Sequence, residues 1–192
     1  MHHIYTTESI VLKRQPQNSS AYYYILTRDL GLITARAQGV RESKSRLKGA
    51  LQEFSLSTVA YVRGKAGWKI TTAIPEKNFW NETKNKQARK KMAHIADSLV
   101  RLITGEEKNL KIFTAVSKGF SLFADDGQDL SAVEVIILAR ILHLLGLLAS
   151  SADTKELLKD YGDFGPEVTS FASDHAALII RAINRGFKES QL

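Results

Sequence analysis

The stretch YYYILTRDLGLITARA, residues 22–37, decides the fold of the first half of the chain. Residues 22–27 are aromatic and β-branched, as strands prefer. The next four residues, Arg28 to Gly31, are typical of a tight turn. After the turn, Ile33, Ala35 and Ala37 alternate with polar side chains, so they share one face of a strand. The stretch predicts two neighbouring strands with one apolar face.

One more strand is expected before this pair and two more after it. Residues 9–13 form a short apolar run, and residues 54–63 alternate over a longer span. Gly64-Lys65-Ala66-Gly67 is a hairpin connection that leads into a returning strand at residues 68–72. Five short strands with glycine-containing turns favour a small closed barrel over residues 1–78. An OB-like barrel is the natural candidate, and an SH3-like barrel is the alternative.

From about Asn81 the apolar period changes to that of helices. Apolar residues recur at three- and four-residue spacing in residues 92–103 and 110–123, which predicts two amphipathic helices. Ser131 and Glu134 have capping-box spacing before the apolar run 135–148, which we expect to form the centre of a bundle. Residues 153–156 predict the cap of a short helix, and residues 176–183 a last helix. The fold class is therefore α+β, with an all-α helical domain over residues 79–192.

Charge is distributed unevenly along the 192 residues. The net charge is +7, but residues 1–91 carry a balance of +11 and residues 92–192 one of −4. This asymmetry suggests a first half made for a polyanion.

Several function classes find no support in the sequence. The chain has no cysteine, which excludes disulfides and thiolate zinc sites and fits a reducing cytoplasm. Its histidines do not form a metal-site pattern, and no phosphate loop, dinucleotide fingerprint or nucleophile elbow is present. No signal peptide is expected at Met1, and the longest apolar run is too short to span a bilayer. We therefore expect a protein that is not an enzyme, with no metal, no cofactor and no membrane contact.

The strongest functional signal is a basic segment between the third and fourth predicted strands. Serines and glycines there let the backbone approach phosphates, while the cations supply charge: Arg36, Arg41, Lys44, Arg46 and Lys48. If about five phosphates are neutralised, the slope of log K against log salt is about −4 to −5. Nearby aromatic residues offer stacking surfaces for bases: Tyr22, Tyr23, Tyr24, Tyr61 and Trp68. A solvated loop and core-filling aromatics are the alternatives.

The same region resembles the signature of the RecO family of DNA repair proteins. The resemblance is most specific in residues 25–55, which include Gly31-Leu32-Ile33-Thr34-Ala35-Arg36-Ala37-Gln38-Gly39-Val40-Arg41, Lys44-Ser45-Arg46-Leu47 and Leu51-Gln52-Glu53-Phe54-Ser55. It extends more loosely over residues 4–148, to the helix ending Leu142-His143-Leu144-Leu145-Gly146.

The resemblance implies an N-terminal OB fold on a helical domain. It implies binding of single- and double-stranded DNA, strand annealing and a RecR-like partner. It also implies help in loading RecA onto DNA covered by single-strand-binding protein, and some members bind the acidic C-terminal tail of that protein. It also implies a cytoplasmic, nucleoid-associated location. Two departures are notable: many members carry a four-cysteine zinc module that this chain lacks, so we expect a shortened, zinc-free variant, and Glu42 reverses one expected charge.

These arguments define the candidate site residues. DNA-backbone contacts are expected at Arg36, Arg41, Lys44, Arg46 and Lys48, with a rim of Arg14, Arg28, Arg63 and Lys65. A second basic cluster either extends the DNA-binding surface or forms an exposed helix face: Lys84, Lys86, Arg89, Lys90 and Lys91. Arg140 and His143, polar exceptions on an apolar helix, are candidates for binding the acidic tail; the alternative is a place at the bundle rim or a pairing with Glu134. The rival functions are a protein-recruiting scaffold that hardly touches DNA and a metal-dependent enzyme acting on nucleic acid.

Overall fold

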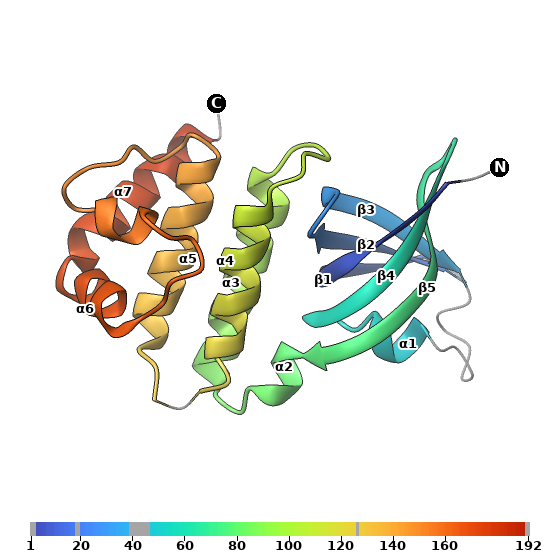
Figure 1. The fold of residues 1–192 in the computed structure, drawn as a ribbon, viewed down its shortest axis with the longest axis horizontal. Coiled ribbons are helices and arrows are strands. Elements are labelled where there is room, and N and C mark those ends of the chain that lie inside the picture. Colours follow the sequence, from blue (N-terminus) through green and yellow to red (C-terminus); the bar gives the residue numbers. More distant parts are fainter. Residues whose placement is uncertain (1–2, 18–19, 39–46, 126, 191–192) are drawn as a thin grey trace. The chain divides into compact units, whose positions relative to one another are not determined.

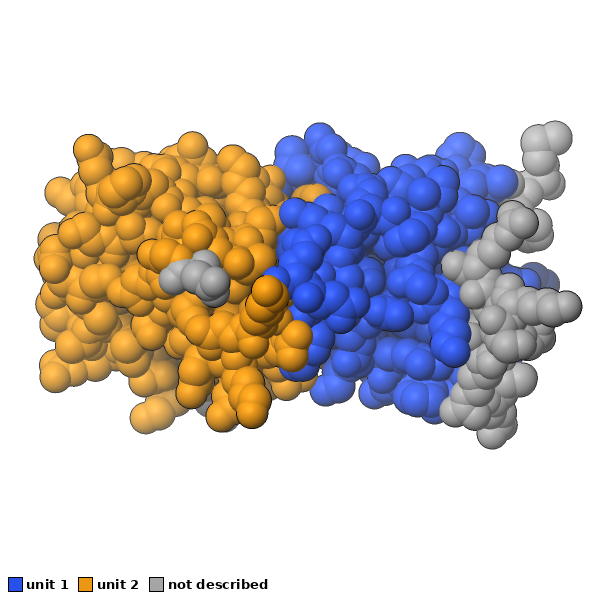
Figure 2. All heavy atoms as spheres, turned by 90° about the horizontal axis from the view of Figure 1, so that it is seen from below, with its two compact units in different colours: residues 1–82, 104–110 blue, residues 83–103, 111–192 orange. Residues whose placement is uncertain are grey.

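The computed structural model describes residues 3–17, 20–38, 47–125 and 127–190. The chain divides into two compact units, coloured separately in Figure 2. The first contains residues 1–82 and also residues 104–110; the second contains residues 83–103 and 111–192. No sequence pattern predicted that residues 104–110 join the first unit.

The first unit is a closed five-stranded barrel (Figure 1). Its strands are β1 (Ile4–Gln17), β2 (Ser20–Thr27), β3 (Gly31–Gln38), β4 (Ser55–Gly64) and β5 (Gly67–Asn78). They follow the order β1-β2-β3-β5-β4, and the long β1 pairs with both β2 and β4 to close the barrel. The β3–β5 pair is parallel and the others are antiparallel. This connectivity is OB-like and confirms the predicted barrel.

Alternation along the strands fills the barrel interior. Tyr23 and Ile25 of β2 and Ile33 and Ala35 of β3 are buried, and the strand residues between Ile33 and Gln38 that face outward are exposed. The hydroxyl of the fully buried Tyr61 donates to Ser9 Oγ at 2.8 Å, which satisfies it inside the core. Burial raises the pKa of Tyr61 above its usual range. The short helices α1 (Leu47–Ala50) and α2 (Phe79–Glu82) also belong to this unit.

The second unit is helical. It contains α3 (Lys86–Leu102), α4 (Leu110–Leu122), α5 (Leu130–Leu144), the 3₁₀ turn η1 (Lys155–Leu158), α6 (Pro166–Asp174) and α7 (Ala176–Glu189). Helix α5 is buried on all sides from Val135 to Leu142 and packs against α3, α6 and α7. The prediction that this apolar helix forms the centre of the bundle is confirmed.

The start of α5 differs from the predicted capping box. The N-cap is Asp129, whose carboxylate accepts from the amides of Ser131 and Ala132 at 2.9 and 3.1 Å. Glu134, the other half of the predicted box, instead accepts from Lys91 Nζ at 2.6 Å. The helix is capped two residues upstream of Ser131, by Asp129, so the capping-box interpretation of Ser131 was wrong. At the short helix predicted near residues 153–156 the structure has η1, and Thr154 before it makes no side-chain cap.

Candidate nucleic-acid interface

One row of the barrel brings polar, aromatic and basic side chains together on its outer face. Gln15 of β1 pairs with Tyr22 of β2, Tyr22 with Arg36 of β3, and Arg36 with Lys69 of β5. These side chains point outward because their strand neighbours Tyr23, Ala35 and Trp68 point into the core. A second row, Lys13 with Tyr24, lies beside the first. We call Lys13, Tyr22, Tyr24, Arg36 and Lys69 the basic face.

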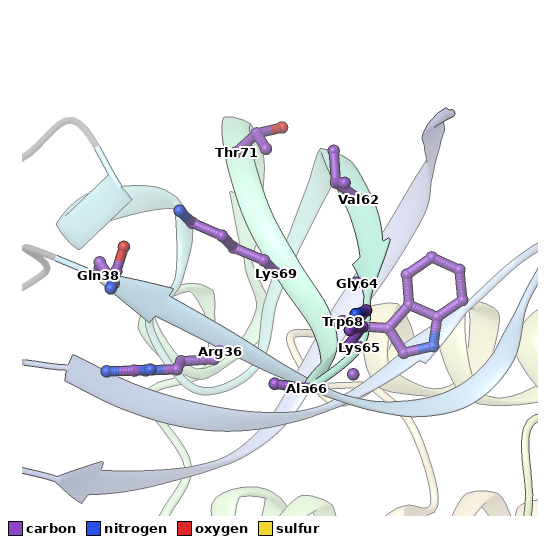
Figure 3. Close-up of a pocket in the computed structure, with 10 residues that line it drawn as sticks. Arg36, Gln38, Val62, Gly64, Lys65, Ala66, Trp68, Lys69 and Thr71 are labelled. Carbon is purple, nitrogen blue, oxygen red and sulfur yellow. The ribbon is translucent and has the colours of Figure 1, made fainter. Parts of the chain in front are cut away.

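A hollow of about 570 Å³ opens beside Arg36 and Lys69 (Figure 3). In Figure 3 the long side chains of Arg36 and Lys69 extend away from the indole of Trp68, toward the end of β3 where Gln38 lies. The β4–β5 loop, Gly64 to Gly67, lines the same hollow and adds Lys65. Arg36 Nε donates to Ser20 Oγ at 3.2 Å, which steadies the guanidinium without neutralising it. Among the described residues, no carboxylate lies within ion-pair distance of Lys65 or Lys69.

Only part of the predicted stacking surface lies outside the barrel. Tyr23 and Tyr61 are fully buried and Trp68 is 5% exposed, so their rings fill the core and the prediction that they stack on bases was wrong. Tyr22 and Tyr24 are partly exposed on the outer face of β2. Side chains alternate along a strand, so Tyr22 and Tyr24 face outward while Tyr23 between them faces the core.

The barrel, and between 56% and 73% of the chain in individual comparisons, resemble known proteins. A family model described as "Recombination protein O N terminal" matches residues 1–77. The DNA repair protein RecO of Caldanaerobacter subterraneus is 30% identical over 108 residues, which cover 56% of this chain and 44% of the relative. That of Dehalococcoides mccartyi strain 195 is 31% identical over 112 residues, 58% of this chain and 44% of the relative. That of Alkaliphilus metalliredigens is 24% identical over 143 residues, 73% and 58%.

Residues 1–77, which contain the barrel, match the N-terminal model of the RecO family. The chain spans about half the length of these RecO relatives. The OB-like barrel on which the RecO resemblance rested is the part that the family model covers.

Only two of the five central cations predicted for this barrel lie within the described residues. Arg41, Lys44 and Arg46 lie outside the described residues. Arg36 lies on the basic face, and Lys48 is exposed on α1. Lys69 was missed by the sequence reasoning, although the alternation Trp68-Lys69-Ile70 already indicates that it faces outward.

The predicted rim residues differ in their surroundings. Lys65 lines the hollow, but Arg28 forms an ion pair with Glu8, and Arg63 lies 3.0 Å from Glu106. Arg14 is half-buried opposite the core residue Tyr23. Burial raises the pKa of Tyr23, and the guanidinium of Arg14 opposes this rise. The structure therefore brings Lys65 to the basic face and gives Arg28 and Arg63 carboxylate partners instead.

Arg140 does not form an accessible binding site. It is fully buried, and its guanidinium donates to three backbone carbonyls, those of Leu157, Tyr161 and Asp163. The prediction that Arg140 contacts a peptide tail conflicts with this burial, because each nitrogen of the guanidinium already donates to a backbone carbonyl. His143 is partly buried, and its Nδ1 donates to the carbonyl of Leu148 at 2.8 Å.

The second basic cluster lies in the helical unit around the start of α3. Lys84, Lys86 and Lys90 are exposed, while Lys91 is partly buried against Glu134. Within the described ranges, no group of three or more histidine, aspartate or glutamate side chains is placed to hold a metal ion. A search of the same ranges finds no helix of the length and apolarity needed to cross a membrane.

Proposed function

We propose that this chain is a RecO-like DNA repair and recombination protein that binds single- and double-stranded DNA through the basic face. The observation that carries the proposal is the row of Tyr22, Arg36 and Lys69, held in register on neighbouring strands. OB folds bind oligonucleotides on strands 2 and 3 and on the loop between strands 4 and 5. Here β2 and β3 carry Tyr22 and Arg36, and the β4–β5 loop carries Lys65. The predicted contacts at Arg41, Lys44, Arg46 and Lys48 extend this site.

Strand annealing follows from the same chemistry. Two complementary strands repel each other as polyanions, and a surface of cations lowers that repulsion while base pairing supplies the driving force. No bond is made or broken, so we propose that the protein acts without catalysis, cofactor or metal. Stacking on Tyr22 and Tyr24 would hold unpaired bases and favour single strands.

The partners proposed from the family are a RecR-like protein, the C-terminal tail of single-strand-binding protein and, indirectly, RecA. The acidic tail requires a cationic surface in the helical unit other than the buried Arg140. Titration of a labelled tail peptide tests this: unchanged affinity in variants of every exposed helical cation would remove the tail from the proposal. A cytoplasmic, nucleoid-associated location is the corresponding expectation.

Fluorescence anisotropy of labelled oligonucleotides across a salt series tests DNA binding. The test variant is Arg36→Glu/Lys69→Glu, and the matched control is Lys155→Glu/Lys188→Glu, which changes the net charge equally on exposed positions of the helical unit. Losing two phosphate contacts should flatten the salt slope for single strands by about 1.4 and weaken binding. The control should bind as the wild type does.

The same titration separates the rival function. A wild type that fails to bind at low salt, or that binds without salt dependence, contradicts the DNA site and favours the protein-recruiting scaffold. Equal losses in the test variant and the control would show that net charge, and not the basic face, sets the affinity.

A further inference from the structure

Three cations of the barrel line the same hollow. Arg36 of β3 and Lys69 of β5 are neighbours in the parallel register, and Lys65 comes from the turn between β4 and β5. Arg36 and Lys69 point outward because the residue before each of them, Ala35 and Trp68, is buried. Within the described ranges, no aspartate or glutamate forms an ion pair with any of the three cations. In this part of the chain, the protein therefore does not neutralise the positive charge of the hollow.

This arrangement of charges is unfavourable without an anion. Like charges at neighbouring positions of adjacent strands repel each other and destabilise the sheet. Arg36 is held in place, because its Nε donates to Ser20 Oγ at 3.2 Å. The two Nη groups of the same guanidinium have no partner among the described residues. An anion in the hollow would relieve the repulsion between Arg36 and Lys69 and would accept from these N–H donors.

The size and lining of the hollow suit a nucleotide with its phosphate. Its volume of about 570 Å³ lies within the range of about 300–1,000 Å³ that is typical of small-ligand sites. Gln38 adds a side-chain amide, and Val62 and Ala66 give the lining an apolar part against which a sugar or a base can lie. Figure 3 shows that the side chains of Arg36 and Lys69 extend from neighbouring strands in the same general direction. The hollow thus combines cations for a phosphate with room for the nucleotide that carries it.

A phosphate at the end of a DNA strand matches this hollow better than a phosphate within the strand. A phosphodiester carries one negative charge and is bonded to the chain on both sides, so it lies along a surface. A terminal phosphate is attached through a single oxygen and can enter a hollow. At neutral pH a phosphate monoester carries a charge of about −1.5 to −2 and has three strong acceptor oxygens. Three cations in one hollow match this larger charge.

We propose that the hollow lined by Arg36, Lys65 and Lys69 binds the terminal phosphate of a DNA strand. The inference rests on the proposed DNA binding and goes beyond it by naming the phosphorylated strand end as the preferred ligand of the hollow. A 5′-phosphate and a 3′-phosphate are both phosphate monoesters with the same chemistry, and the experiment distinguishes them. The phosphate is bound without the making or breaking of a covalent bond.

Fluorescence anisotropy with three matched oligothymidylates tests the inference on the full chain. The first strand carries a 5′-phosphate, the second carries a 3′-phosphate, and the third has hydroxyl ends and is one nucleotide longer. All three strands therefore contain the same number of phosphates, and an internal label leaves both ends free. One more neutralised charge raises single-strand affinity about fivefold at a salt concentration of about 0.1 M. The wild type should bind at least one phosphorylated strand about fivefold more tightly than the third strand.

The pH dependence of this preference is a second readout. The second pKa of a phosphate monoester is about 6, whereas a phosphodiester keeps its single charge. The affinity ratio of the phosphorylated strand to the hydroxyl-ended strand should therefore fall toward one between about pH 7 and about pH 5. The described residues that line the hollow include no histidine, aspartate or glutamate, so the fall reports on the terminal phosphate.

Lys65→Gln is the test variant, and Lys13→Gln is the matched control. Each removes one positive charge from the barrel. Lys65 lines the hollow, whereas Lys13 is an exposed residue of the basic face outside the lining. Both variants should bind every strand more weakly than the wild type does, because both lose a cation near DNA. The affinity ratio should fall only in Lys65→Gln.

The outcomes separate this inference from the proposed function. If the wild type binds the phosphorylated and hydroxyl-ended strands equally, the inference is overturned while DNA binding stands. The same holds if the affinity ratio is unchanged in Lys65→Gln or falls equally in Lys13→Gln, because the hollow then does not hold the strand end. If none of the strands binds, the proposed function falls, and the inference falls with it.

Discussion

Replacing Arg140 with methionine tests how the C-terminal part of the helical unit is held. The guanidinium leaves central helix α5 and donates from Nε to Leu157 O at 2.7 Å, from Nη1 to Tyr161 O at 3.2 Å and from Nη2 to Asp163 O at 2.5 Å. It also lies 4.6 Å from the ring centroid of Phe164. One side chain therefore fixes the irregular segment that connects η1 to α6.

The cost of the substitution follows from these contacts. A hydrogen bond to a charged group stabilises by about 1.5–3 kcal/mol, and an orphaned buried carbonyl costs about 1–3 kcal/mol. Burial lowers the pKa of Arg140 to about 10, with Asp163 and Asp160 opposing the shift, so the group stays charged at neutral pH and its desolvation cost is relieved in the variant. Parts of the freed segment are partly exposed and can take up water. We expect a loss of about 3 kcal/mol, at the lower end of the range for breaking a buried charged group's contacts.

Urea unfolding measures this loss in the helical unit. Both tryptophans, Trp68 and Trp80, lie in the barrel unit, so their fluorescence follows the barrel while far-UV circular dichroism is dominated by the helices. With a urea slope of about 1–3 kcal/mol/M, the helical midpoint of Arg140→Met should fall by roughly 1–3 M. The control is Arg181→Met on the exposed side of α7, which should change stability by less than about 0.5 kcal/mol. An Arg140→Met midpoint equal to that of the wild type would refute the structural role given to this arginine.

Three further changes test local features of the fold. Asp129→Ala removes the cap of α5 and should cost about 1 kcal/mol at neutral pH. Hydrogen bonds from the Ala132 amide and from a serine hydroxyl lower the pKa of Asp129, so this stabilisation is full above about pH 4 and is lost as the pH falls through the pKa of Asp129 in the folded protein. Urea unfolding should therefore show the stabilities of the two proteins converging in acid. Gly31→Ala places a Cβ against Glu107 at positive φ and should lower the thermal midpoint by an amount corresponding to at least about 2 kcal/mol; an unchanged midpoint would contradict the close approach. Tyr61→Phe removes a buried hydroxyl hydrogen bond and should cost about 1 kcal/mol in barrel unfolding followed by tryptophan fluorescence, whereas a stabilised variant would show that the hydroxyl is poorly satisfied.

The barrel strands were predictable because alternation reports which side chains face inward. Residues 32–37 place Ile33, Ala35 and Ala37 inside, and the structure buries all three. The same rule applied to β2 would have separated the outward Tyr22 from the inward Tyr23. The stacking prediction failed because it gathered aromatic residues by their nearness in sequence and not by strand face.

Long-range contacts were beyond the sequence patterns. The parallel pairing of β3 with β5, which aligns Arg36 with Lys69, joins strands that are not consecutive, and nothing local encodes that register. The carbonyls that bind Arg140 lie 17 to 23 residues downstream, one in the short 3₁₀ turn η1 and two in the irregular segment after it. A lone arginine on an apolar helix indicates a polar partner but not its identity.

The central claim is that DNA lies on the basic face of the barrel. The most direct measurement is NMR mapping of backbone amide shifts in the full chain during titration with a short oligothymidylate. We predict the largest changes at Tyr22, Arg36 and Lys69 and in the Gly64–Gly67 loop, with little change in α5. Shift changes confined to the start of α3, or none at saturating oligonucleotide, would contradict it.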